Sequence, residues 1–128
     1  MFKSRIVLAT ILMTGMLGAG AAMAENVIQT GKTSAGKVLT DSAGMTLYTF
    51  DNDTAAVSNC NGDCAVKWPP LEAKANARPT DKFGIIIRAD GSRQWAYKGE
   101  ALYTWFKDEK PGDITGDGVK GVWHLAKP

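Results

Sequence analysis

The chain has 128 residues, with 15 Lys and Arg residues against 13 Asp and Glu residues and a formal net charge of +2 at pH 7. Lys3 and Arg5 account for the whole excess, so the chain from residue 25 onward is neutral. Nucleic acids and anionic membrane surfaces both select a basic excess, so neither is expected as a partner.

Residues 1–24 have the order of regions that is typical of a cleavable signal peptide. A basic start at Lys3 and Arg5 precedes the apolar run Ile6–Met13 and a stretch of small residues that ends at Ala24. The apolar part is shorter than the roughly 20 residues that span a bilayer, which argues against a retained anchor. We therefore expect cleavage after Ala24 and a periplasmic or secreted protein with no membrane span.

The chain after the leader has the pattern of short β-strands separated by Gly, Pro and Asp turns. The expected strands, in chain order, are 38–40, 46–50, 85–87, 94–97, 101–106 and 122–125. Turns are expected at 41–44, 90–91 and 98–99. No stretch after the leader has a convincing helical period, so little helix is expected.

An internal repeat with an offset of 55 residues organises these strands. Leu47–Phe50 recurs as Leu102–Trp105. The same offset relates four further pairs of identical residues: Gly36 and Gly91, Gly44 and Gly99, Asp53 and Asp108, and Trp68 and Trp123. We therefore expect an all-β fold, in which residues 25–128 form one small domain. It is built from two repeats that each contain a β-hairpin, at 36–71 and 91–126, joined by a connector.

Cys60 and Cys64 are the two cysteines of the chain. In an oxidising compartment an isolated pair is most simply a disulfide. A redox or metal role is the alternative, but catalytic redox pairs are usually separated by two residues rather than three, and no nearby His completes a zinc set. Because the closed loop is short, the bridge is expected to contribute only about 2 kcal/mol.

The repeated segments contain two copies of the motif Tyr-x-(Phe/Trp/Tyr)-x-x-Asp, as Tyr48-x-Phe50-x-x-Asp53 and as Tyr103-x-Trp105-x-x-Asp108. Together with Cys60-x-x-x-Cys64-Ala65-x-x-Trp68-Pro69-Pro70 and Gly112-Asp113-x-x-Gly116 through Trp123-His124, this pattern resembles a family of secreted proteins and lipoproteins known as secreted repeats of unknown function. The resemblance implies an exported protein and brings no established activity.

One departure from that family concerns the processing site. Many members carry a lipid on a cysteine there, whereas Ala24 and Glu25 offer no thiol. We therefore expect a protein without a lipid anchor.

The aromatic and acidic residues of the two motifs are the first candidates for a functional site. Along a strand, each Tyr shares a face with the ring two residues further on. The rings either form the core of a small β domain or wall a ligand cleft between the repeats. Asp53 and Asp108 are expected to accept hydrogen bonds from loop amides rather than to act as catalysts. The candidate ligand-binding residues are Tyr48, Phe50, Asp53, Tyr103, Trp105 and Asp108.

A second candidate site would hold a metal ion at Asp113, Asp117 and His124. The loop 113–118 resembles the start of an EF-hand calcium loop, but Thr115 replaces an acid or amide, and His124 stands where the bidentate Glu is required. A tight glycine turn explains the same loop without a metal. His124 would alternatively bind copper together with Met45, or serve as a structural hydrogen-bonding residue.

The sequence favours a binding protein over an enzyme. It contains no nucleophile elbow, His-Glu-x-x-His motif, phosphate loop or Rossmann fingerprint. We therefore expect a non-catalytic envelope module without a cofactor, which binds a small ligand or an envelope protein between its repeats. Two alternatives stay open: a periplasmic protein that binds calcium or copper, and a small hydrolase with paired carboxylates.

Overall fold

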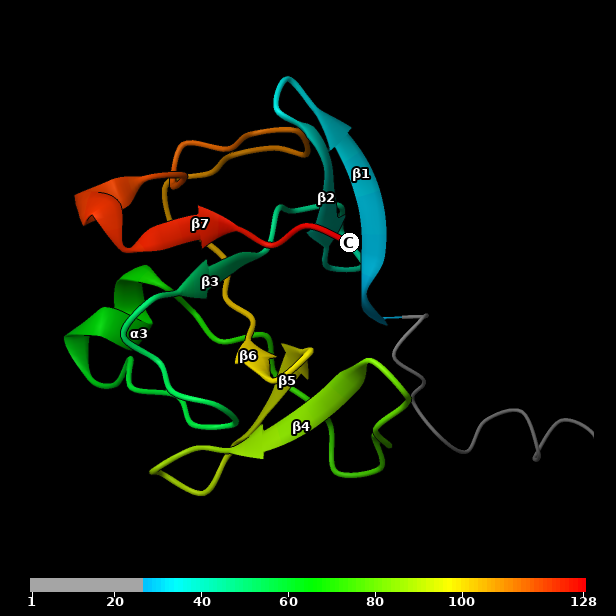
Figure 1. Cartoon of the computed structure of the whole chain (residues 1–128), viewed down its shortest axis with the longest axis vertical. Helices are drawn as coiled ribbons and strands as arrows, with labels where there is room; N and C mark the ends of the chain where they lie inside the picture. The colour runs from blue at the N-terminus through cyan, green and yellow to red at the C-terminus, as the bar shows by residue number, and fades with distance from the viewer. Residues whose placement is uncertain (1–26) are drawn as a thin grey trace, which may run out of the picture.

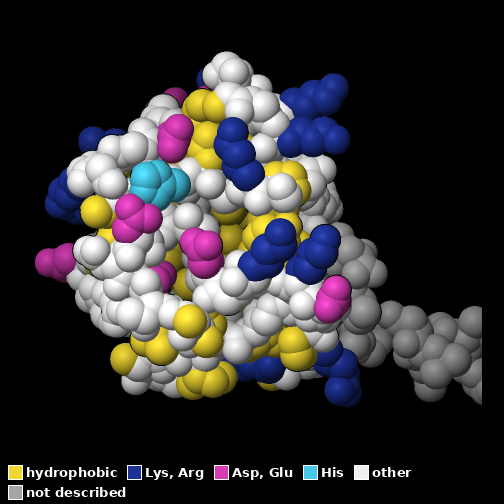
Figure 2. Space-filling view, viewed as in Figure 1, with side chains coloured by type: hydrophobic (Ala, Val, Ile, Leu, Met, Phe, Trp, Pro, Cys, Tyr) yellow, Lys and Arg dark blue, Asp and Glu magenta, His cyan; other side chains and the backbone are white. Residues whose placement is uncertain are grey.

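The structure is a computed structural model that describes residues 27–128 (Figure 1). The predicted leader and its cleavage site lie outside these residues. Within the described part of the chain, no helix is long and apolar enough to cross a membrane. Lys and Arg side chains are interspersed with Asp and Glu side chains on the face viewed in Figure 2, in keeping with the neutral balance of charge.

Most of the regular structure is short antiparallel β-strand, so the all-β prediction is confirmed. The elements are β1 (Gln29–Thr33), β2 (Gly36–Thr40), β3 (Tyr48–Phe50), α3 (Asp63–Lys67), β4 (Phe83–Ile87), β5 (Arg93–Tyr97), β6 (Glu100–Ala101), the 3-10 turn η2 (Val119–Gly121) and β7 (Trp123–Leu125). They form three small sheets, β1-β2, β3-β7 and β4-β5-β6.

The turns follow from local chemistry. Between β2 and β3, the Asp41 carboxylate accepts hydrogen bonds from the amides of Ala43 and Met45, which closes the predicted turn. Between β5 and β6, Lys98 and Gly99 both have positive φ angles, of 51° and 86°. Two such residues make a tight hairpin loop whose twist matches that of the strands.

The last segment of each repeat pairs with the hairpin of the other repeat. Ala126 lies between Leu39 and Leu47, accepting a hydrogen bond from the first amide and donating to the carbonyl of the second. Leu71 makes the matching contacts with Trp95 and Leu102. In the same way, the amide of Asp51 donates to Val122 and that of Phe106 donates to Lys67. We call this arrangement strand exchange.

The segments 47–48 and 102–103 of the two hairpins lie between two hydrophobic cores. Because successive side chains of a strand point to opposite faces, Leu47 and Leu102 enter one core while Tyr48 and Tyr103 enter the other. The first core also contains Ile28, Leu39, Ala73, Ala77, Trp95 and Ala126. The second also contains Cys60, Trp68, Ile86, Ala96, Ala101 and Trp123. This second core carries most of the residues of the repeated motif.

Candidate functional site

The two motif tyrosines meet at the centre of the molecule. The backbone amide of Tyr48 donates to the carbonyl of Tyr103 at 2.8 Å, and the amide of Tyr103 donates back at 3.0 Å. Both side chains are fully buried. Since these residues are equivalent in the two repeats, their mutual pairing marks an approximate twofold axis between the repeats.

Each tyrosine hydroxyl binds the aspartate of the other repeat. Tyr48 Oη donates to Asp108 Oδ2 at 2.6 Å, and Tyr103 Oη donates to Asp53 Oδ2 at 2.7 Å. The second oxygen of each carboxylate accepts from a loop amide, that of Thr115 for Asp108 and that of Asn59 for Asp53. The expectation that these aspartates accept from loop amides is confirmed. The exchanged Tyr–Asp pairs therefore hold the repeats together.

Burial controls the ionisation of these groups. Desolvation raises the pKa of both Tyr48 and Tyr103 well above the usual range of a phenol, and the adjacent carboxylates raise it further. Desolvation also raises the pKa of Asp53, against the lowering effect of its hydrogen bonds and of the Arg88 charge. Both hydroxyls therefore stay protonated as donors, and neither tyrosine is poised to serve as a base.

The remaining aromatic residues of the second core form a continuous stack of four rings. Phe50 stacks on Trp123 with ring centroids 4.1 Å apart, and Trp123 stacks on Trp68 at 3.7 Å. Trp105 packs on Trp68 at 4.0 Å with its ring tilted by 32°. Phe50 and Trp105 are equivalent by the 55-residue offset, as are Trp68 and Trp123. Each outer ring of the stack thus packs on a tryptophan from the other repeat.

A cleft of about 430 Å³ runs along this stack, between α3 and η2. Its volume lies in the range of small-molecule sites. The residues lining it are Phe50, Asn52, Asp63, Cys64, Lys67, Trp68, Trp105, Val119, Lys120, Val122 and Trp123. Among them are four pairs at the 55-residue offset: Phe50 and Trp105, Cys64 and Val119, Lys67 and Val122, and Trp68 and Trp123. The cleft therefore lies on the approximate twofold axis.

Of the six residues predicted to bind a ligand, Phe50 and Trp105 line this cleft. Tyr48 and Tyr103 lie behind its wall instead, packed perpendicular to Trp68 and Trp123. Asp53 and Asp108 bind the tyrosine hydroxyls, as described above. The motif thus supplies both a wall of the cleft and the internal polar contacts that support that wall.

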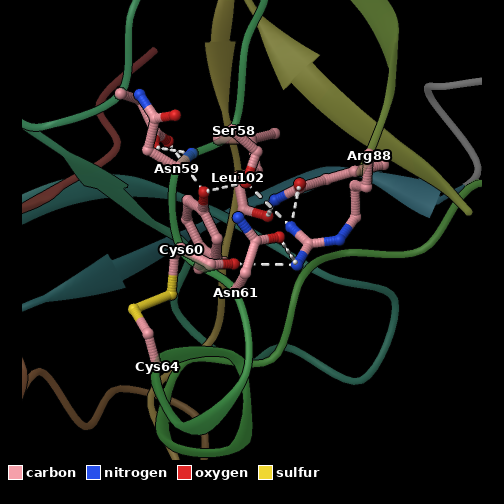
Figure 3. Close-up of a disulfide and its surroundings, with 10 residues drawn as sticks. Ser58, Asn59, Cys60, Asn61, Cys64, Arg88 and Leu102 are labelled. Atoms are coloured by element: carbon pink, nitrogen blue, oxygen red, sulfur yellow. Dashed lines mark hydrogen bonds between the residues drawn. A yellow bond between two sulfur atoms is a disulfide. The ribbon is translucent and has the colours of Figure 1, made fainter. Parts of the chain in front are cut away.

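The disulfide between Cys60 and Cys64 is present, as predicted. Cys60 is fully buried in the second core, while Cys64 is half-buried at the start of α3 and lines the cleft. The bridge therefore fixes the one-turn helix α3 against the core (Figure 3).

Arg88 is a buried cation that the sequence analysis did not identify. Its guanidinium donates to Ser58 Oγ, Gln94 Oε1 and the Cys60 carbonyl, each at 2.8 Å, and to Asn61 Oδ1 at 3.3 Å (Figure 3). These acceptors are neutral, and all but Gln94 lie 27 or more residues away in the chain, so no charge pattern in the sequence indicates the contact.

A directed hydrogen-bond chain connects this cation to the exchanged pair of Tyr103 and Asp53. Ser58 Oγ lies 2.6 Å from Tyr103 Oη. Because Arg88 only donates and the Asp53 carboxylate only accepts, the Ser58 hydroxyl must donate to Tyr103. This series of hydrogen bonds therefore links the Arg88 guanidinium to the Asp53 carboxylate through the hydroxyls of Ser58 and Tyr103, and the two ions do not contact each other directly.

Of the three candidate metal ligands, Asp113 and His124 lie in separate contacts, and Asp117 is an exposed residue whose amide donates to the carbonyl of Ile114. Asp113 accepts hydrogen bonds from the amides of Glu109 and Lys110 and pairs with the Lys110 ammonium, and the Glu109 amide is the main cause of its lowered pKa. His124 Nε2 lies 2.8 Å from Asp51 Oδ2, and both side chains are exposed. Within residues 27–128, no group of three or more His, Cys, Asp or Glu side chains is placed to hold a metal ion.

Fold and motif together define a two-repeat β domain with exchanged strands. A family described as a secreted repeat of unknown function matches the chain twice, at residues 29–72 and 84–127. The chain belongs to this family, which confirms the resemblance of the motifs. Both ends of the second match lie 55 residues beyond those of the first, which is the offset of the motifs. No curated protein and no solved structure matched the chain.

Proposed function

We propose that the protein is a non-catalytic, exported binding module whose ligand occupies the cleft between α3 and η2. The observation that carries this proposal is the placement of the cleft on the approximate twofold axis, with equivalent residues of both repeats in its walls. Small-molecule sites are concave and mostly apolar, and the aromatic stack gives this cleft that character.

The chemistry of the motif supports binding rather than catalysis. Asp53 and Asp108 each accept a tyrosine hydroxyl and a loop amide, so their oxygens are already engaged. The raised pKa of Tyr48 and of Tyr103 disfavours a phenolate nucleophile or base. Phe50 and Trp105 are the two predicted ligand-binding residues that contact the ligand in this proposal, and the tyrosines position the tryptophans behind it.

The proposal places this module in the periplasm or outside the cell, without an anchor. It rests on the leader-like sequence of residues 1–24 and on Ala24 and Glu25 at the expected processing site. Mass spectrometry of the exported protein should find a chain that begins at Glu25 and has no added lipid. Uncleaved chain in the membrane fraction would contradict this.

Occupancy of the cleft is tested with a neutral apolar dye, N-phenylnaphthylamine, whose fluorescence rises in an apolar site. The chain from Glu25 should bind the dye in a saturable manner. Val119→Trp fills the cleft from η2 and should weaken binding by about tenfold or more. Val57→Trp is the matched control, because Val57 is 47% exposed and does not line the cleft. Equal affinity of the two variants, or no saturable binding, would refute the proposed site.

A further inference from the structure

Trp68 and Trp123, the two inner rings of the aromatic stack, can face the cleft only with their ring edges. Trp105 and Trp123 both lie within about 4 Å of Trp68 and make no ring contact with each other, so they cover opposite faces of Trp68. Phe50 and Trp68 cover opposite faces of Trp123 in the same way. Trp68 and Trp123 are 4% and 3% exposed. The inner rings therefore offer no free face on which a sugar or a cation would stack.

Ring edges and ring faces attract opposite charges. The edge of an aromatic ring carries the positive end of its quadrupole, whereas the face carries the negative end. Cationic ligands are recognised by exposed faces. A wall built of indole edges favours an electron-rich or anionic group instead.

The charged side chains of the cleft also favour an anionic group. Lys67 at the end of α3 and Lys120 in η2 line it from opposite sides, with Asp63 as the single acid among the lining residues. Among residues 27–128, neither ammonium takes part in an ion pair, since the salt bridges there are Lys110–Asp113 and His124–Asp51. The lining thus carries two positive charges and one negative charge, which is an excess of one positive charge.

A third feature is the indole N–H of Trp105. It is buried and has no hydrogen-bond acceptor among the described residues. An indole nitrogen can only donate, and an unsatisfied buried donor is costly. Because Trp105 lines the cleft, a ligand that places an acceptor oxygen beside its indole N–H would give this donor a partner.

We infer that the cleft selects an amphipathic anion: a small molecule with an apolar body and one carboxylate, sulfonate or similar acidic group. The apolar body lies along the aromatic stack, and the acidic group lies between Lys67 and Lys120. This inference rests on the proposed function, because it specifies the ligand class of the same cleft.

The experiment compares two dyes with the same aromatic body. N-phenylnaphthylamine is neutral, and anilinonaphthalenesulfonate adds a sulfonate to the same frame. The chain from Glu25 should bind the anionic dye about tenfold more tightly than the neutral dye at low salt. Lys67→Gln with Lys120→Gln should reduce this preference to about threefold or less, because the affinity for the anionic dye falls by a larger factor than the affinity for the neutral dye.

Matched variants separate the cleft from general surface charge. Lys37→Gln with Lys74→Gln removes two lysines outside the cleft and should leave the preference intact. Trp105→Phe keeps a ring but removes the donor, and should lower the affinity for the anionic dye more than that for the neutral one. The inference is overturned if the neutral dye binds as tightly as the anionic one, or if the cleft and control lysine pairs have equal effects. Failure of both dyes to bind would overturn the proposed function itself.

Discussion

Tyr48 and Tyr103 each bind an aspartate that follows the other tyrosine in the chain, and this crossing determines what the motif does. The spacing Tyr-x-x-x-x-Asp joins residues that do not contact each other within one repeat. The contacts are Tyr48 with Asp108 and Tyr103 with Asp53, across the twofold axis. A motif of this kind needs its second copy, because each hydroxyl would otherwise lack its acceptor.

Truncation of these tyrosines separates packing from hydrogen bonding. Tyr48→Ala and Tyr103→Ala should each lower the free energy of unfolding by about 3–5 kcal/mol, the range for deletion of a large buried aromatic. Tyr48→Phe and Tyr103→Phe keep the ring and leave a carboxylate without its donor, so each should cost about 1–3 kcal/mol. Tyr97→Phe is the control, because the Tyr97 hydroxyl makes no hydrogen bond among the described residues. Urea unfolding measures all five, and a Phe variant as stable as the parent would refute the role of the exchanged pairs.

Asp53 should make stability depend on pH in an unusual direction. Its pKa is raised in the folded protein, chiefly by burial, so the folded state holds this proton more tightly than the unfolded state does. Stability from this group therefore increases as pH falls through the raised pKa, and decreases as pH rises. Asp53→Asn removes the titration. As the pH falls from about 7 to about 4, the free energy of unfolding of the parent should rise relative to that of Asp53→Asn. A relative fall over that interval would show that the carboxylate is stabilised by its partners instead.

At the scale of the elements, what the sequence reveals depends on length and pattern. Strand β4 has an unbroken Ile85–Ile87 run and β5 has Gln94–Tyr97, and both are predicted. Strand β1 is not predicted, because Gln29–Thr33 has no apolar alternation; it pairs along its whole length with β2. Helix α3 has five residues, too few to show a helical period, and its position depends on the disulfide.

The residues of the candidate site also fall into a set that the sequence predicts and a set that it does not. Phe50 and Trp105 are predicted because they recur in a motif, and Trp68 and Trp123 recur as well. Lys67, Val119 and Lys120 were not predicted, because nothing near them in the chain marks a binding site. Strand exchange determines which residues meet across the cleft. The periodicity of the sequence does not indicate whether strands are exchanged. Two repeats that exchange strands and two that pack side by side have the same sequence repeat.

The disulfide supplies a prediction at this scale. Cys60→Ser with Cys64→Ser should lower the free energy of unfolding by no more than about 2 kcal/mol, since the closed loop is short. The backbone amides of α3 should lose protection from hydrogen exchange more than those of β4 and β5, because the bridge holds α3 to the core. The double variant should remain folded. Its complete unfolding, or protection of α3 equal to that of the parent, would contradict this role.

For the whole molecule, strand exchange leads us to expect that the two repeats fold as one unit. The segment 67–71 lies against the second hairpin, and the segment 122–126 lies against the first. Both cores contain residues from both repeats. A single matched segment, 29–72 or 84–127, therefore encloses no complete core of its own. We therefore expect neither matched segment to fold without the other.

The interdependence of the repeats is testable by cutting the chain between them. Asp81 and Lys82 are exposed and lie between the two matched segments, so a specific protease site inserted there should leave the uncut protein native. After cleavage, the two fragments should stay together as a native complex, because the exchanged strands and the Tyr–Asp pairs do not depend on the connector.

The isolated fragments give the second part of the test. When they are separated in urea and returned singly to buffer, each fragment should lack the near-ultraviolet circular dichroism of its packed rings. Each would then expose an unpaired hairpin edge and half of the aromatic stack. Mixing equal amounts should restore the native spectrum at a rate that depends on concentration, as two-chain assembly requires. The uncut chain should refold at a rate independent of concentration. A first fragment that folds alone as a monomer would show that each repeat closes on itself, and the exchange would then be no requirement of the fold.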